Sequence, residues 1–150
     1  LVSEINLLTH LELLEVRREI ERLMARAAAE RSSATERKAF AKIAKGMETA
    51  AKKNQAIAFM RLDHELNQAI AKAARNQFAR KTVELMAGLS RRFWYNHYKD
   101  AADLPLCARL HADLAQLIAG GDIKGAAAAS DKLIDYIEKF AKGTVESRGR

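Results

Sequence analysis

The sequence predicts an all-α protein, an antiparallel bundle of about six helices, on three observations. First, alanine, leucine, lysine, arginine and glutamate dominate its 150 residues, strand-forming residues are sparse and there is one proline. Second, apolar residues recur at helical spacing in successive segments. Third, capping residues and glycines interrupt that spacing only briefly, so the connections are short and successive helices should pack largely antiparallel. The length fits one domain that can bury a core.

Capping signals divide the first half of the chain into three expected helices. The first helix should cover about residues 7–30. The segment 33–36 reads Ser-Ala-Thr-Glu, a capping box in which the serine accepts from the backbone and the glutamate reaches back. It begins a second helix that ends near Lys53. A third helix is expected over about residues 55–74, and Asn76 marks the break after it.

Three more helices are expected in the second half. The fourth covers about residues 77–98. Pro105 lies at the start of the fifth, where its missing N–H costs nothing. The glycine pair at 120–121 ends the fifth helix, and Asp122 caps the sixth. The sixth runs to about Lys142, and the polar residues after it are expected to fray.

Cys107 is the single cysteine, so an intrachain disulfide is excluded. Because it lies in a helical apolar pattern, we expect a small core residue in a reducing compartment, with a reactive thiol as the alternative. The sequence has no apolar run of membrane-spanning length and no signal-peptide pattern at its start. A cytoplasmic location is therefore expected.

The formal charge of +7 raises the question of nucleic-acid binding. Most of the excess falls within residues 17–53, as arginine and lysine interleaved with glutamate. The sequence contains no glycine-rich loop, no basic cluster with stacking aromatics and no Cys/His finger spacing. A basic, solvated face is the favoured interpretation, and a helical nucleic-acid-binding module is an alternative.

The third expected helix carries polar side chains on its inward stripe. Asp63 falls at the centre of that stripe, Asn67 beside it and His64 at its edge. A carboxylate on a core face is costly unless it is paired or binds something. The apolar members of the stripe are Ala56, Phe59, Met60, Leu66, Ile70 and Ala74.

Three other helices add polar groups to the same interior. Arg17 lies within the stripe of the first helix, and His111 borders the stripe of the fifth. In the fourth helix the stripe includes Arg92 and Asn96 and leaves Arg91 outside. The apolar stripe of the first helix is Leu13, Val16, Ile20, Leu23, Met24 and Ala27. That of the fourth is Phe78, Leu85, Met86, Leu89 and Phe93.

Polar groups from four helices exceed what a plain core needs, and they predict a ligand cavity. Arg17 and Arg92 against one aspartate leave this cavity net positive, so its ligand should be an anion. The planar fork of arginine binds carboxylate or phosphate bidentately. The alternative is a buried network, in which one of the two arginines neutralises Asp63 and Asn67 fills hydrogen bonds.

A second feature of the fourth helix bears on assembly. Val83, Ala87 and Trp94 point away from its apolar stripe. An exposed apolar strip on one helix is often a dimer contact. The alternative is that another helix of the same chain covers the tryptophan.

The pattern does not favour an enzyme. No Ser/His/Asp or Cys/His arrangement occurs at a recognisable spacing, and no paired carboxylates fall on facing helices. A metal site is a weak possibility at Asp63 and His111, which supply only two good ligands. A histidine four residues after Asp63 would add a third, but Asn67, a poor zinc ligand, stands there.

Two segments match motifs of a known family. Residues 14–17 read Leu-Glu-Val-Arg and are followed by Glu21 and an alanine-rich stretch. Residues 59–63 read Phe-Met-Arg-Leu-Asp and are followed by Ile70 and by Ala-Ala-Arg-Asn at 73–76. These resemble the opening helix and the aspartate helix of the FCD domain. That domain is the ligand-sensing C-terminal part of the FadR branch of GntR-family bacterial transcription regulators.

A third segment extends the resemblance. His111, with Gly-Asp at 121–122 and Ala126 after it, is similar to the family's closing pair of helices. Each motif is loose alone, but three in the right order at the right distances are more specific. The resemblance covers essentially the whole chain. It implies an antiparallel helical bundle that dimerises and binds a small effector in its centre.

The family resemblance also has implications for a metal. In many members an aspartate and three histidines hold a metal that helps to bind a carboxylate effector. Asp63 and His111 fill two of those positions, whereas Asn67 and Leu133 stand where two of the histidines would be. The chain therefore resembles the metal-free members, whose known representative senses fatty acyl-CoA, and we expect no cofactor.

The resemblance and the residue pattern together give the expected function. Arg17 falls on the family's helix-one arginine, which is associated with effector binding, and Arg92 on the arginine of the fourth helix. We expect residues 1–150 to form an effector-sensing domain of a homodimer, with Met60, Phe93 and Cys107 as apolar walls. The residues expected to bind a small organic acid or acyl thioester are Arg17, Asp63, Asn67, Arg92 and His111.

Full regulators of this type bind DNA through an N-terminal winged-helix domain. Nothing in these residues resembles one, and the chain begins where the linker into the sensing domain would lie. We therefore expect a C-terminal fragment that meets DNA only through the missing domain. The main alternative is a helical interaction domain that binds no ligand and whose inward polar groups form a satisfied network.

Overall fold

Six helices joined by short connections make up the part of the chain described by the computed structural model, residues 6–148. They are α1 (Leu7–Arg31), α2 (Ala34–Lys53), α3 (Ala56–Ala73), α4 (Gln77–Ala101), α5 (Leu104–Ala119) and α6 (Ile123–Arg148). The predicted all-α bundle is confirmed. None of the helices described in this range is long and apolar enough to cross a membrane.

Side-chain caps set the helix boundaries where the sequence predicts them. The hydroxyl of Ser33 accepts from the backbone N–H of Glu36 at 3.1 Å, and the Glu36 carboxylate accepts from the N–H of Ser33 at 2.9 Å, which completes the capping box. Asn76 accepts from the first turn of α4, and Asp122 from the first turn of α6. Gly121 ends α5 with φ of +70°, a conformation that favours glycine.

The end of α6 differs from the prediction. The helix was expected to stop near Lys142, but it continues to the last described residue. Phe140 and Ala141 are buried, and the hydroxyl of Thr144 donates to the carbonyl of Ala141 at 2.7 Å. Packing of this last stretch extends the helix, which its polar composition did not indicate. Residues 149–150, also part of the predicted tail, lie outside the described residues.

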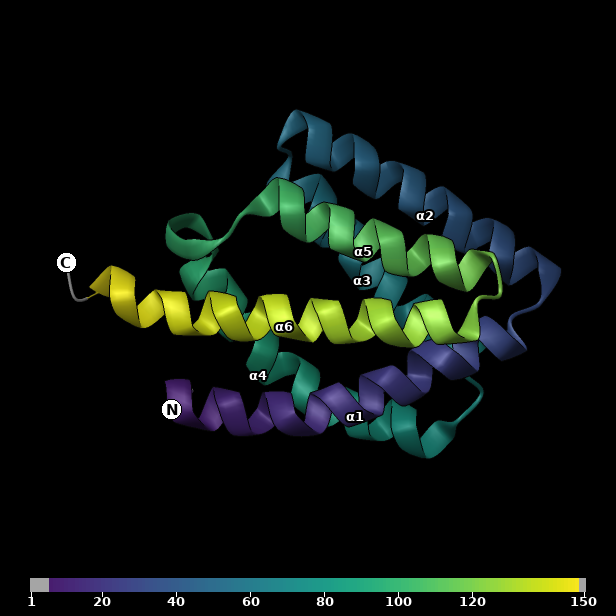
Figure 1. The fold of residues 1–150 in the computed structure, drawn as a ribbon, viewed down its shortest axis with the longest axis horizontal. Helices are drawn as coiled ribbons and strands as arrows, with labels where there is room; N and C mark the ends of the chain where they lie inside the picture. The colour runs from purple at the N-terminus through teal and green to yellow at the C-terminus, as the bar shows by residue number, and fades with distance from the viewer. Residues whose placement is uncertain (1–5, 149–150) are drawn as a thin grey trace.

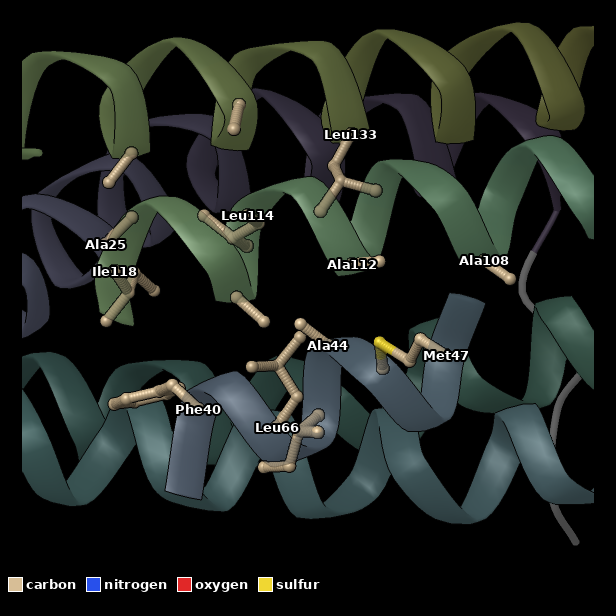
Figure 2. Close-up of a cluster of buried hydrophobic side chains, with 14 of the residues drawn as sticks. Ala25, Phe40, Ala44, Met47, Leu66, Ala108, Ala112, Leu114, Ile118 and Leu133 are labelled. Atoms are coloured by element: carbon tan, nitrogen blue, oxygen red, sulfur yellow. The ribbon is translucent and has the colours of Figure 1, made fainter. Parts of the chain in front are cut away.

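The main core lies between α2 and α5. In Figure 2, Phe40 and Met47 of α2 face Ile118 and Ala108 of α5, respectively, so the two helices run antiparallel. Burying a side chain such as Phe40 or Met47 stabilises the fold by about 1.5–3 kcal/mol. Alanines bring the two backbones close together, and the single cysteine, Cys107, is buried in this cluster as predicted.

A second antiparallel pair, α1 and α6, lies side by side on the opposite side of the bundle (Figure 1). Arg18 donates to Asp135 at 2.7 Å, and Arg22 contacts Asp131 at 2.9 Å. These partly exposed ion pairs connect the two helices at the surface and add little to stability, because solvent screens them. The closest helix pairs are therefore α1/α6 and α2/α5 rather than sequence neighbours. In particular, α3 and α4 make few contacts with each other, and both helices line the candidate cavity described below.

Candidate ligand cavity

A cavity of about 660 Å³ lies between α1, α3, α4, α5 and α6. Its volume falls within the range of small-molecule sites, roughly 300–1,000 Å³. Most of its wall is apolar, and polar groups are concentrated in the middle and at the opening. The apolar lining includes Met24, Phe59, Met60, Leu66, Ile70, Val83, Phe93, Trp94, Cys107, Leu114, Leu133, Ile134, Ile137 and Phe140. The predicted walls Met60, Phe93 and Cys107 are all among them.

His111 and Asp63 face each other across the middle of the cavity. His111 Nε2 lies 3.1 Å from Asp63 Oδ1, and His111 Nδ1 lies 2.7 Å from the carbonyl oxygen of Cys107. Both oxygens can only accept a hydrogen bond from the ring, so both nitrogens carry protons and the ring is an imidazolium. The predicted inward position of both side chains is confirmed.

The electrostatics of this pair favour its charged form. Burial alone lowers the pKa of His111, but neighbouring Cys107 and the Asp63 carboxylate outweigh it and raise the pKa well above 6.5. Burial likewise raises the pKa of Asp63, yet the His111 charge, helped by Arg17, holds that pKa below its usual value. The two groups therefore neutralise each other within the cavity.

Arg17 also lines the cavity, as predicted, but its donors are already engaged. Nε and Nη2 donate to the two carboxylate oxygens of Glu21 at 2.8 and 3.2 Å, and Nη1 donates to the hydroxyl of Ser90 at 2.8 Å. Glu21 stands four residues after Arg17, a spacing that places two side chains together on a helix. The interior thus contains two ion pairs, Arg17–Glu21 and His111–Asp63, instead of an unpaired arginine.

Further polar groups lie at the opening, between α3 and α4. Asn67 lines the cavity from α3 but is exposed, so it belongs to the opening rather than to the closed interior. Arg61 and His64 precede it on α3, and Arg91 and Tyr95 line the cavity from α4; all four are exposed. Among the side chains that the structure describes, neither Arg61 nor Arg91 has an ion-pair partner.

The predicted position of Arg92 is wrong. Arg92 and Asn96 are exposed and do not line the cavity, whereas Arg91, expected outside, does. The true inner face of α4 is marked by buried Ala79, Met86 and Phe93, with Val83, Ala87 and Ser90 beside them. The error arose because this face carries small residues, while the large apolar Phe78, Leu85 and Leu89 point outward.

The outward strip predicted on α4 is wrong for the same reason. Val83, Ala87 and Trp94 line the cavity. The indole ring of Trp94 lies 4.7 Å from the ring of Phe140 and 6.5 Å from that of Phe59, measured between centroids. Other helices of the same chain therefore cover the tryptophan, which is the alternative that the sequence left open.

His10 is a wall residue that the sequence reasoning did not identify. It is 1% exposed, and its ring stacks on Phe93 with centroids 4.1 Å apart. Neither ring nitrogen has a hydrogen-bond partner within the described residues. Burial, together with the charge of Arg17, lowers the pKa of His10 to about 4, so the ring is neutral at physiological pH. The only available signal was its position two turns before Arg17 on the same face.

The residues of the site do not fit a resident metal ion. Both nitrogens of His111 are engaged, and its Nε2 contacts the carboxylate of Asp63 directly. Asn67 and Leu133 line the same cavity. The amide of Asn67 is a poor metal ligand, and the side chain of Leu133 cannot bind a metal. The described side chains include no group of three His, Cys, Asp or Glu that could hold a metal. That the protein works without a metal stays a prediction.

Comparison with models of known protein families identifies a match. The family model described as "FCD domain" matches residues 12–136. This range includes every cavity-lining residue except His10, Ile137 and Phe140. No curated protein matches the chain.

Proposed function

The chain belongs to the family of FCD domains, and we propose that it is the effector-sensing and dimerising domain of a GntR-family transcription regulator of the FadR branch. Proteins with this domain are transcription regulators rather than enzymes. The observation that carries the proposal is the cavity of about 660 Å³ enclosed by five helices of the matched domain. DNA would be bound by a winged-helix domain outside residues 1–150.

The charges of the cavity support an anionic effector. Three arginines and the His111 imidazolium line it, against the two carboxylates of Glu21 and Asp63. The positive excess comes from Arg61 and Arg91 at the opening, because the interior charges cancel in pairs. An anion is therefore attracted to the opening first, and arginine suits carboxylate or phosphate.

The apolar walls support an effector that is also hydrophobic in part. Phe59, Phe93, Trp94 and Phe140 surround the inner space with aromatic surface. A small organic acid with an apolar body fits entirely inside. An acyl thioester would place its chain inside the cavity and its charged part near Arg61 and Arg91, which line it. The two cases share one chemistry, an anion joined to an apolar group, and differ in how far the anion enters.

An effector acid that enters fully must compete with Glu21 for Arg17. The guanidinium binds both oxygens of the Glu21 carboxylate, so a ligand carboxylate can replace it with the same bidentate geometry. Arg17 also holds Ser90 of α4, so this exchange alters the contact between α1 and α4. Binding then favours one packing of these helices over another, in proportion to the ligand's affinity for each.

One observation favours the alternative, an interaction domain without a ligand. The interior polar groups other than His10 are largely satisfied by one another, through the Arg17–Glu21–Ser90 and Asp63–His111–Cys107 contacts. A network of this kind needs no ligand for its stability.

Thermal-shift measurements distinguish the two functions. The chain is heated with increasing concentrations of short dicarboxylates, medium-chain fatty acids and acyl-CoAs. A ligand that binds the folded state raises the Tm progressively with its concentration, by RT ln(1 + [L]/Kd) in free energy. A melting temperature that stays constant across all three classes of anion supports the ligand-free domain and contradicts the sensing function.

A further inference from the structure

His10 is a buried polar side chain of the cavity wall whose hydrogen-bonding groups are unused. It lies near the start of α1, is 1% exposed and lines the cavity. Neither Nδ1 nor Nε2 has a hydrogen-bond partner among the described residues. A neutral imidazole has one N–H donor and one acceptor nitrogen, and leaving both unpaired in a buried place costs stability. Phenylalanine would avoid this cost, so packing does not explain the histidine.

The surroundings of His10 are aromatic. Its ring stacks on Phe93 with the centroids 4.1 Å apart and the planes inclined by 5°. Phe93 meets Phe140 edge-on with centroids 6.2 Å apart, and Phe140 lies 4.7 Å from Trp94. All four side chains line the cavity, and we call them its aromatic end. A group inside the cavity that reached His10 would therefore meet a polar ring edge within an otherwise apolar wall.

The charge state of the ring indicates what kind of group it can bind. Burial, with Arg17 and His97 nearby, lowers the pKa of His10 to about 4, so the imidazole is neutral at physiological pH. An anion has a stronger partner in the guanidinium fork of Arg17, so the group that meets His10 belongs to the other end of the ligand. A hydroxyl both donates and accepts a hydrogen bond, and it therefore fits either tautomer of the ring.

The spacing of His10 and Arg17 sets the length of such a ligand. The two residues are seven positions apart on α1, two turns, which corresponds to about 10 Å along the helix axis. The guanidinium of Arg17 reaches towards Glu21, on the side away from His10. With a hydrogen bond at each end, an extended chain of about eight carbon atoms covers the distance that remains.

We propose that the aromatic end is a subsite for a neutral hydroxyl group, and that the effector is a medium-chain acid whose carboxylate binds Arg17 and whose terminal hydroxyl binds His10. This inference rests on the function proposed above. It narrows the effector from an anion with an apolar body to one that is polar at both ends. The unpaired ring is then a binding group that lowers the stability of the empty protein, a cost that is common at functional sites.

Isothermal titration of matched acids into the whole chain tests the subsite. The probes are octanoate and 8-hydroxyoctanoate, which differ by one terminal hydroxyl. We expect the hydroxyl to raise the affinity of the wild type by about 10-fold. The pairs hexanoate with 6-hydroxyhexanoate and dodecanoate with 12-hydroxydodecanoate should show a smaller gain, because their hydroxyls fall short of the ring or pass it.

Variants of His10 identify the group that recognises the hydroxyl. His10→Phe keeps a ring on Phe93 and removes both nitrogens, so the preference should disappear while octanoate binds at least as well. His10→Gln keeps a donor and an acceptor and should retain part of the preference. His97→Phe is the matched control, because His97 also contacts Phe93, at 4.7 Å between centroids, but does not line the cavity. Circular dichroism confirms that each variant is folded.

The outcomes separate this subsite from the sensing function. Equal affinity of the wild type for octanoate and 8-hydroxyoctanoate, or a preference that persists in His10→Phe, overturns the hydroxyl subsite and leaves the sensing function intact. The same holds if neither acid binds but another anion raises the Tm. If no anion raises the Tm, both proposals fail.

Discussion

Arg17 of α1 donates a hydrogen bond of 2.8 Å from Nη1 to the hydroxyl of Ser90 on α4, while its other donors bind Glu21. Arg17 thus connects the cavity wall on α1 to α4, the helix whose outer side carries the exposed side chains of Phe78 and Leu85. In the proposed function, an anion that entered the cavity would compete with Glu21 for Arg17, and this competition would act on α4 through Ser90.

Removing the charge of Glu21 should strengthen effector binding. In Glu21→Gln the guanidinium of Arg17 loses its internal counter-charge, so a ligand carboxylate no longer has to displace it. We expect the affinity for the anion found by thermal shift to rise about 10-fold, roughly 1.4 kcal/mol. Isothermal titration measures it, with Glu19→Gln, on the exposed side of α1, as control. An affinity that falls in Glu21→Gln contradicts the competition.

Removing the hydroxyl of Ser90 should loosen α1 from α4. Ser90→Ala deletes the acceptor of Arg17 Nη1, at a cost of about 0.5–1.5 kcal/mol in the free energy of unfolding. Denaturation in urea measures this loss. In a protein that already carries Arg17→Lys, adding Ser90→Ala should cause no further loss of stability. Lysine lacks the planar fork with which arginine reaches Ser90 and Glu21 together. Equal losses in both backgrounds would show that Ser90 acts without Arg17.

The Asp63–His111 pair should make stability depend on pH in a defined direction. Because the pKa of His111 is raised on folding, its contribution is complete below about 6.5 and is lost as pH rises through the raised pKa. The pKa of Asp63 is lowered, so its contribution is present above about 3.9 and is lost as pH falls through the lowered value. Melting curves between pH 6 and 10 should therefore show a declining Tm.

Asp63→Asn tests the source of that decline. The substitution leaves the His111 proton without a carboxylate, so the pKa of His111 should fall and the alkaline decline in Tm should shrink. NMR titration of the His111 ring measures the pKa directly. His111 titrating in the wild type at or below 6.5 would refute the imidazolium assignment, whatever the melting curves show.

Replacing His10 with phenylalanine should stabilise the protein. Phenylalanine keeps a ring to stack on Phe93 and removes two buried nitrogens without partners, so we expect a gain of about 1–3 kcal/mol. The wild-type pKa of about 4 means that the unfolded chain takes up a proton on His10 between pH 6.5 and 4 while the folded chain does not. As the pH falls from 6.5 to 4, the free energy of unfolding of the wild type should therefore decrease. That of His10→Phe should decrease less steeply. A loss of stability at pH 7 contradicts this.

The sequence predicted the helices well because their ends are local. Ser33 with Glu36, Asn76 and Asp122 make the caps that their positions indicate. The inward stripe of α3 was also predictable, since Phe59 and Leu66 are large and Asp63 interrupts them. The end of α6 was not, because it depends on packing around Phe140 rather than on a capping residue.

The inner face of α4 could not be predicted from hydrophobicity. In this helix the large apolar residues Phe78 and Leu85 are exposed, whereas small residues such as Ser90 line the cavity. A periodicity argument follows the larger residues, so it placed Arg92 inside and Arg91 outside. The wall of a cavity reverses the usual rule because it must leave space, and the large apolar side chains of this helix are exposed on its other side.

The central claim, that the cavity binds an anionic effector through its arginines, is tested most directly by isothermal titration of the best thermal-shift ligand into four proteins. These are the wild type, Arg17→Ala, Arg91→Ala and the control Arg92→Ala, whose side chain lies outside the cavity. Loss of one arginine–carboxylate contact should weaken binding about 10-fold or more in the first two variants and leave the control unchanged. Affinity retained in both cavity variants, or lost only in Arg92→Ala, would contradict the claim.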